Sequence, residues 1–195
     1  MLRRLIALAA LAAVVLAPSA LAANVKIRVE GKTTTIFGAV QPRVAADNPL
    51  QALDLASVAG EFHYAVATAS FGVYVNQIGK YPAAGTSGWV FKVNGVSPPV
   101  GADQVALKDG DTVLWYYATF GAAGGPPTLE LQRLPGNCYL VQSLDDTGKR
   151  TRAAPATLVA DGKRTQTKAG RACIGAHVGL VRAVAPGAVR SNAAK

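Results

Sequence analysis

The amino-acid sequence predicts a mainly β protein made of two units. The first, residues 23–120, is an α+β module in which one helix crosses a sheet, and the second, residues 128–190, is a small disulfide-linked, immunoglobulin-like β-sandwich. Three observations support this prediction. Short runs of β-branched and aromatic residues alternate with Gly-containing turns, only one segment has helical spacing, and the charge balance changes near residue 121.

The distribution of charge separates the two units. Residues 24–120 carry seven Lys and Arg against seven Asp and Glu, whereas residues 121–195 carry eleven against four. The Gly- and Pro-rich segment 121–127 lies at this change and has the composition of a linker. We therefore expect a neutral first domain, a linker over residues 121–127 and a basic second domain.

Residues 1–22 have the pattern of a secretory signal peptide. Arg3 and Arg4 precede an apolar run over residues 5–16, and Ala20-Leu21-Ala22 is a small-x-small cleavage site. An uncleaved N-terminal anchor is the alternative. Because no later apolar run is long enough to cross a bilayer, we expect a secreted protein without a membrane span after cleavage.

The two cysteines fit an exported protein. Cys138 and Cys173 fall in different predicted strands, and in an oxidising compartment they are expected to form one disulfide that holds the small second core together. Two free buried thiols are the alternative. On the chain-entropy model, this bridge would contribute about 3–4 kcal/mol to stability.

The only predicted helix of the mature chain follows Asn48. Asn48 is a good N-cap, Pro49 suits the first helical position, and Gly60 can end the helix in the left-handed conformation. Leu53 and Ala56 recur with Leu50 at helical spacing. The pattern therefore predicts a short helix that lays one apolar face on a sheet.

Strands are predicted around this helix by period-2 alternation and turn residues. Residues 25–29 and 33–37 form a predicted hairpin around the turn at residues 30–32. Further strands are expected at residues 62–66 and 72–75, followed by a flexible loop over residues 79–87 that contains Tyr81.

Both tryptophans lie in the segment 88–119, which carries the strongest strand signals. In the first strand, Trp89 faces away from Val90 and Lys92, and Asn94-Gly95 then predicts a tight hairpin turn. In the second strand, Val113, Trp115 and Tyr117 face one way and Leu114 and Tyr116 the other. A strand that is apolar on both faces is usually central, with one face against the helix. The other face is covered by the hairpin's own side chains, by the neighbouring domain, or by a ligand.

In the second unit, the pattern predicts short strands separated by turns. These are expected near residues 128–131, 138–141, 157–159, 172–174 and 178–183. Basic residues gather beside two of the turns: Lys149, Arg150 and Arg152, and then Lys163, Arg164 and Lys168. They could bind an anionic cell-envelope polymer, or they could be solvated loop charges. Nucleic acid is not expected, because no aromatic residues interleave with the charges.

Several motifs together resemble the transcobalamin-like C-terminal (β) domain family. They are the helix after Asn48-Pro49, Phe-Gly-Val-Tyr-Val-Asn-Gln-Ile-Gly from residue 71, Gly-Trp-Val-Phe-Lys-Val-Asn-Gly from residue 88, and Leu-Lys-Asp-Gly-Asp-Thr-Val-Leu-Trp-Tyr-Tyr from residue 107. The resemblance covers about residues 25–120. It implies a β-grasp-like sheet crossed by one helix, and cobalamin as a possible ligand. The carriers also grip cobalamin with a helical domain, which this chain does not contain.

The sequence favours binding over catalysis. His63 and His177 lie in different predicted domains, and neither adjoins a nucleophile or a zinc-ligand cluster. Asp109 and Asp111 flank a glycine, but the other positions of a calcium loop are missing. We therefore expect no catalytic residue, metal or cofactor.

The expected function is that of a secreted, non-catalytic binding protein for a small planar or extended ligand. Large, rigid aromatic side chains suit such a ligand, and they are Tyr74, Tyr81, Trp89, Trp115 and Tyr117. The site is expected on the face of the Trp115 strand that the helix leaves open, with Tyr81 at its rim. The alternative is a cell-envelope interaction or adhesion module built from two β-domains.

Overall fold

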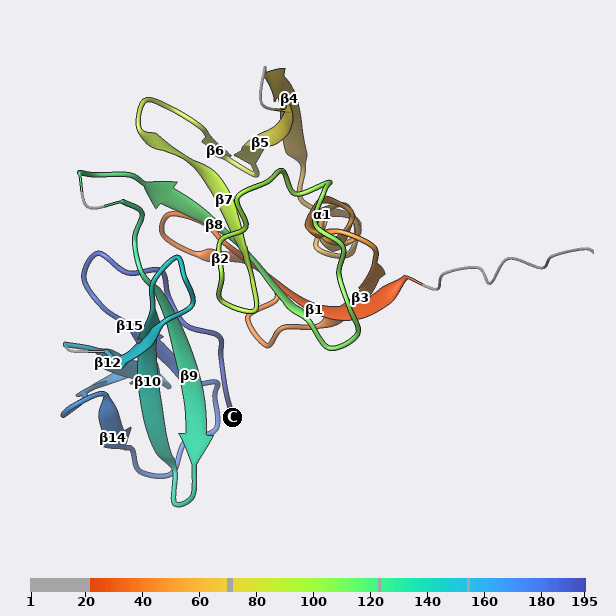
Figure 1. Cartoon of the computed structure of the whole chain (residues 1–195). Coiled ribbons are helices and arrows are strands. Elements are labelled where there is room, and N and C mark those ends of the chain that lie inside the picture. Colours follow the sequence, from red (N-terminus) through yellow and green to blue (C-terminus); the bar gives the residue numbers. More distant parts are fainter. Residues whose placement is uncertain (1–21, 70–71, 123, 154) are drawn as a thin grey trace, which may run out of the picture.

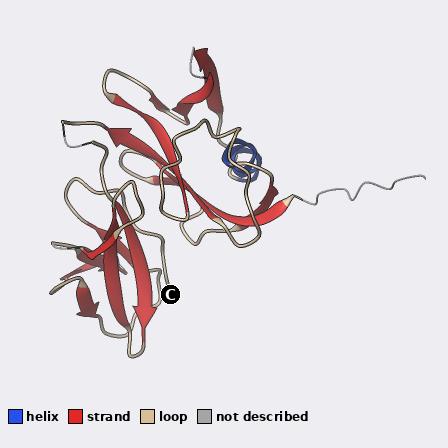
Figure 2. Cartoon of the chain, viewed as in Figure 1, coloured by secondary structure: helices blue, strands red, loops and turns tan. Residues whose placement is uncertain are grey.

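The computed structural model describes residues 22–69, 72–122, 124–153 and 155–195. The predicted signal peptide, apart from Ala22, lies outside these residues. Figure 2 shows a mainly β protein in which one helix stands among many strands, as the sequence predicts. The described part of the chain contains no helix of the length and apolarity that a membrane span requires.

The main N-terminal sheet has five strands. They are β1 (Ala23–Glu30), β2 (Thr35–Phe37), β3 (Arg43–Ala46), β7 (Ser87–Val93) and β8 (Thr112–Thr119). The sheet order is β2-β1-β8-β7, with β3 also pairing with β1, and β1 lies parallel to β8 while the other pairs are antiparallel. The first strand, β1, and the last, β8, pair in parallel at the centre of the sheet, and the helix lies between them in the sequence. This is the β-grasp-like arrangement that the resemblance implies.

Helix α1 (Pro49–Ala59) starts as predicted but ends differently. The side chain of Asn48 accepts a hydrogen bond from the backbone N–H of Gln51 at 2.9 Å. Gly60 has φ −105°, so the predicted left-handed stop at this glycine is wrong; the positive φ, 51°, belongs to Glu61. Gly60 is required for packing instead, because a Cβ there would lie 2.6 Å from the ring of Phe37.

A second, three-stranded sheet lies beside the first. It comprises β4 (Tyr64–Ala69), β5 (Gly72–Ile78) and β6 (Tyr81–Pro82). The predicted strand over residues 62–66 therefore begins two residues late, and Tyr81 lies in a short strand where a loop was predicted. The Asn94-Gly95 turn is confirmed, with φ values of 53° and 86° that reverse the chain between Val93 and Val96.

The C-terminal unit consists of two small sheets around one core. Its strands are β9 (Thr128–Leu134), β10 (Cys138–Leu144), β11 (Arg150–Arg152), β12 (Thr157–Ala160), β13 (Lys163–Gln166), β14 (Arg171–Cys173) and β15 (Arg182–Val184). One sheet has the order β11-β10-β14 with β9 also on β10, and the other has the order β13-β12-β15. Leu131 and Tyr139 from the first share a buried cluster with Leu158 and Ala183 from the second. The β-sandwich is thus confirmed (Figure 1).

The predicted disulfide between Cys138 and Cys173 is present. The two cysteines are directly opposite each other on the neighbouring strands β10 and β14, within one sheet. The bridge therefore fixes the pairing of two adjacent strands of one sheet and does not link the two sheets, so the expectation that it holds the core together is wrong.

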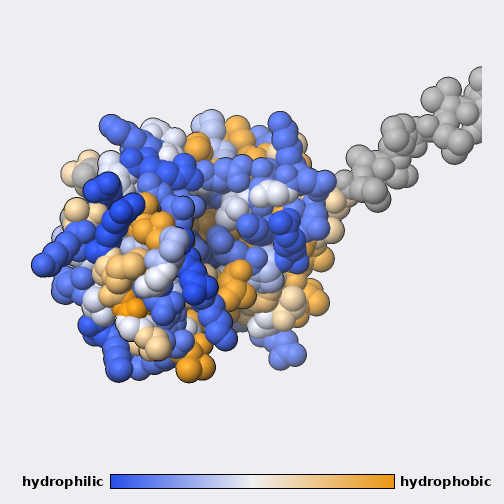
Figure 3. All heavy atoms as spheres, turned by 90° about the horizontal axis from the view of Figure 1, so that it is seen from below, coloured by the Kyte–Doolittle hydropathy of each residue, from blue (hydrophilic) through white to orange (hydrophobic). Residues whose placement is uncertain are grey.

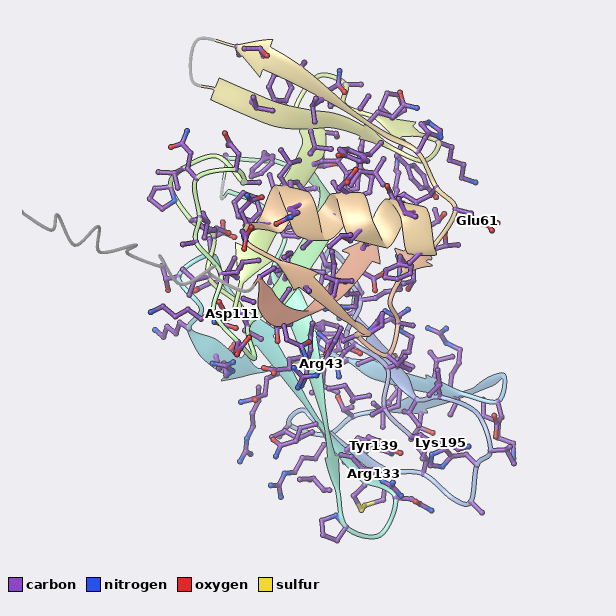
Figure 4. The ribbon with its side chains drawn as sticks, turned by 90° about the vertical axis from the view of Figure 1, so that its right-hand side faces the viewer. Arg43, Glu61, Asp111, Arg133, Tyr139 and Lys195 are labelled. Atoms are coloured by element: carbon purple, nitrogen blue, oxygen red, sulfur yellow. A yellow bond between two sulfur atoms is a disulfide. The ribbon has the colours of Figure 1, made fainter. Side chains whose placement is uncertain are left out.

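The C-terminal unit covers the face of the main sheet that the helix leaves open. In Figure 4, α1 lies on one side of the N-terminal sheet and the C-terminal strands, marked by Tyr139, lie on the other, with Arg43 at the boundary. Tyr116 from β8 is only 1% exposed and packs in a cluster with Val189 of the C-terminal unit. Of the predicted alternatives for this face, the neighbouring domain is what the structure shows. The prediction of a ligand site on this face is therefore wrong, and Trp115 points to the opposite face, where it packs against α1.

A buried carboxylate lies at this domain interface. The Glu30 side chain is fully buried, and it pairs with Arg28 at 3.1 Å and with Arg190 at 2.9 Å. Arg182 also binds the Glu30 carboxylate, which in addition accepts hydrogen bonds from the Thr35 hydroxyl. Two of these arginines come from the C-terminal unit. Because a buried charge is costly unless it is paired, these contacts make docking and the burial of Glu30 depend on each other.

Lys92 makes a second buried polar contact across the interface. Its side chain is fully buried, and its ammonium donates to the backbone carbonyl of Asp145 at 2.8 Å. The Asp146 carboxylate lies 3.3 Å away. Burial lowers the pKa of Lys92, and the Asp146 charge opposes that shift.

We expect Glu30→Gln to destabilise the protein by about 3–5 kcal/mol, because it leaves three arginines around a neutral side chain. Urea unfolding followed by circular dichroism measures this. The matched control is Glu130→Gln, which breaks the exposed Glu130–Arg150 pair and should cost less than about 1 kcal/mol. Equal losses in the two variants would show that the Glu30 cluster does not stabilise the docked domains.

Candidate functional site

A groove of about 450 Å³ opens beside β7, an edge strand of the main sheet. Strand β5 forms its opposite wall, and the segment 97–102, which follows the Asn94-Gly95 turn, forms its rim. This volume falls within the range that small-molecule sites usually have, about 300–1,000 Å³.

The groove is lined mainly by apolar and aromatic side chains. The aliphatic and proline residues are Leu50, Val73, Val75, Val90, Pro98, Pro99, Val100 and Ala102. The aromatic residues are Tyr74, Trp89, Phe91, Trp115, Tyr116 and Phe120. Ser97 and Asp146 supply polar groups at one end. An apolar wall with a few polar groups is the composition expected of a site for a small organic molecule.

Three of the five predicted binding residues line this groove: Tyr74, Trp89 and Trp115. Trp115 is 2% exposed, and its indole N–H donates to the carbonyl of Pro49 at 3.0 Å, which fixes the ring against the start of α1. Trp89 donates to the carbonyl of Tyr81 at 2.8 Å. Because each indole N–H already has an acceptor, the surface that these two rings offer to a ligand is apolar, and it is small, since Trp89 is 7% and Trp115 2% exposed.

The other two predicted residues, Tyr81 and Tyr117, do not line the groove. Their rings lie 6.0 Å apart, and the ring of Tyr117 meets that of Trp89 edge-on at 5.5 Å. The Tyr117 hydroxyl donates to the carbonyl of Pro82 at 3.1 Å. Tyr117 therefore packs against β6, of which Tyr81 is part, and both tyrosines contact each other or Trp89 instead of lining the groove. The segment 97–102 forms the rim where Tyr81 was expected.

Sequence reasoning missed this rim segment and its contact with the second domain. The backbone N–H of Ser97 donates to the carbonyl of Asp146 at 2.8 Å, and the Ser97 hydroxyl donates to the Asp146 carboxylate at 3.1 Å. At the far end of the rim, Leu50 N–H donates to the carbonyl of Ala102 at 3.4 Å. The pair Pro98-Pro99 was the one available signal, since proline restricts the backbone before it and stiffens a loop.

Electrostatic effects keep the groove uncharged at its aromatic wall. Burial, reinforced by the Asp146 carboxylate, raises the pKa of Tyr116 from its ordinary value near 10 to about 12, so its phenol, neutral at physiological pH in any case, also stays neutral in moderately alkaline solution. Asp146 itself pairs with the Lys92 ammonium. Its charge is therefore largely balanced within the protein.

Neither histidine lies in the groove. His63 hydrogen-bonds the side chain of Gln77 at 3.0 Å, and His177 hydrogen-bonds the hydroxyl of Tyr139 at 3.0 Å. Within the described ranges, no group of three or more His, Cys, Asp or Glu residues is placed to hold a metal ion.

The predicted basic clusters are exposed, with Arg150 and Arg152 on β11 and Lys163 and Arg164 on β13. The face of the molecule in Figure 3 is mostly hydrophilic with separate apolar patches.

Comparison with known proteins adds a family match over part of the chain. Residues 51–119 match the family model described as a domain of unknown function, DUF4430. This segment contains β4–β8 and most of α1, and hence most of the groove. No curated protein matches the sequence. Among solved structures, a Ruminococcus gnavus protein titled "a putative metal binding protein" matches with a TM-score of 0.36 and 14% identity, over 49% of this chain and 95% of the other. None of these matches names a cobalamin carrier.

Proposed function

We propose that this protein is a non-catalytic binding protein whose groove takes a small, planar or extended, mainly apolar molecule. The observation that carries this proposal is the groove itself, in which Trp89, Phe91 and Trp115 provide an apolar wall. The aromatic rings are held in place by hydrogen bonds and neighbouring rings, so little conformational entropy is lost when a ligand stacks on them.

Both domains contribute to the proposed site. Asp146 of the C-terminal unit lines one end of the groove and binds Ser97 of the rim. A ligand group that can hydrogen-bond would lie at this end, and its apolar part would lie along β7. The resemblance to the transcobalamin-like domain makes a corrin the first planar molecule to test.

The arrangement of the histidines supports a non-catalytic role. A general base must lie within hydrogen-bond reach of the group it activates. His63 and His177 contact an amide and a buried phenol, and in the described residues neither forms a hydrogen bond with a serine, cysteine or carboxylate.

We further propose that the protein acts outside the cytoplasm. The signal-peptide pattern of residues 1–22 and the Cys138–Cys173 disulfide both support export, since disulfides persist mainly in oxidising compartments. Mass spectrometry of the protein recovered from the producing cells should find Ala23 at the N-terminus. Recovery of the chain with residues 1–22 still attached, from the cytoplasm, would contradict export.

Ligand binding is tested with tryptophan fluorescence, because both tryptophans line the groove. Cobalamins and a panel of planar apolar molecules are titrated into the protein, and calorimetry confirms any quenching. We expect one of them to bind with a dissociation constant below about 50 μM, which corresponds to a standard binding free energy more favourable than about −6 kcal/mol. Val100→Asp places a charge at the 46%-exposed rim and should weaken binding about tenfold or more.

The matched control is Val178→Asp, at an 81%-exposed valine of the C-terminal unit outside the groove. It should leave the affinity unchanged. Equal weakening by both substitutions would place the ligand elsewhere. Absence of binding by the whole panel, together with retention on an anionic cell-wall polymer, would favour the envelope-interaction role instead.

A further inference from the structure

A second cavity, of about 220 Å³, lies between the two domains and shares no residue with the groove. Lys26 and Arg28 of β1 line it from the N-terminal sheet, and Thr128 and Glu130 of β9 line it from the C-terminal unit. Its lining is mainly polar and charged. A polar cavity at a domain interface is a place where a bound group can contact both domains at once.

Arg28, which lines this cavity, has one donor without an acceptor. The side chain is 4% exposed, and its Nη1 donates to the Glu30 carboxylate at 3.1 Å and to the Arg190 carbonyl at 2.6 Å. Its Nε–H is buried and finds no acceptor in the described parts of the chain. Burial lowers the pKa of Arg28 to about 10, so the guanidinium is still charged at neutral pH. A buried charged donor without an acceptor is costly, which favours an acceptor being supplied from outside the protein.

The cavity also has an excess of positive charge. Lys26 is half-buried, and no hydrogen bond or ion pair of its ammonium occurs with any described residue. The one acidic residue in the lining, Glu130, already pairs with Arg150 at 3.1 Å. The single carboxylate near Arg28, that of Glu30, is shared by three arginines. The Lys26 ammonium therefore has no counter-charge among the described residues, and Arg28 shares its one carboxylate with two other arginines.

We infer that this interdomain cavity binds a small oxyanion, with oxygen atoms accepting hydrogen bonds from Arg28 Nε–H and from the Lys26 ammonium. A tetrahedral phosphate or sulfate and a carboxylate share the chemistry that these donors recognise. The side chain of Gln41, which also lines the cavity, is a third possible donor. Because the lining comes from both domains, the bound anion stabilises the docked arrangement.

The test uses the whole chain with phosphate, sulfate and acetate in separate titrations, each at constant ionic strength adjusted with sodium chloride. Thermal unfolding should shift upward with a saturable dependence on the oxyanion that binds, and calorimetry gives its dissociation constant. Lys26→Gln should raise that constant about tenfold or more, as expected for a lost charged hydrogen bond. Lys80→Gln, at an exposed lysine outside the cavity, should leave it unchanged. Comparison of the three anions separates a tetrahedral from a carboxylate ligand.

A second measurement does not depend on any variant. The assigned Nε–H resonance of Arg28 should shift in nuclear magnetic resonance spectra of the natural protein as the anion is added, and the Gln41 side-chain amide should shift with it. The inference is overturned if none of the three anions binds with saturation, if Lys26→Gln and Lys80→Gln behave alike, or if the shifts are confined to the exposed basic strand β13, which does not line the cavity.

Discussion

The structure depends on one interaction, the burial of the Glu30 carboxylate among three arginines at the domain interface. Glu30 lies at the end of β1, and Arg182 and Arg190 reach it from the other domain. A carboxylate that is fully buried would be strongly unfavourable without these partners. Without the C-terminal unit, the sheet face around Tyr116, now buried, would likewise become an exposed apolar patch. The pairing of Glu30 and the covering of this sheet face both favour the docked arrangement of the two domains.

The docking of the two domains also determines the shape of the groove. The apolar wall belongs to the N-terminal module, but the position of the rim depends on the hydrogen bonds between Ser97 and Asp146 of the second domain. Buried Lys92 ties the same turn of the C-terminal unit to β7. The second domain is therefore part of the proposed site.

Local signals in the sequence were enough to predict much of the fold. The N-cap Asn48, the Asn94-Gly95 turn and the two-residue alternation around Trp115 each act over a few neighbouring residues, and all three are confirmed. The role of Glu30 was not predictable in this way, since it was expected in a turn and its partners Arg182 and Arg190 are more than 150 residues away. The groove was predicted in part. Trp89 and Trp115 line it, but its rim at residues 97–102 has no periodic pattern and takes its place from a contact with the other domain.

The most direct test of this account is differential scanning calorimetry of the intact chain. If the Glu30 cluster and the covered sheet face join the domains into one cooperative unit, unfolding occurs in a single transition whose calorimetric enthalpy is about equal to its van't Hoff enthalpy. Two separable transitions, or a calorimetric enthalpy about twice the van't Hoff value, would show that the domains unfold independently and would contradict the central claim.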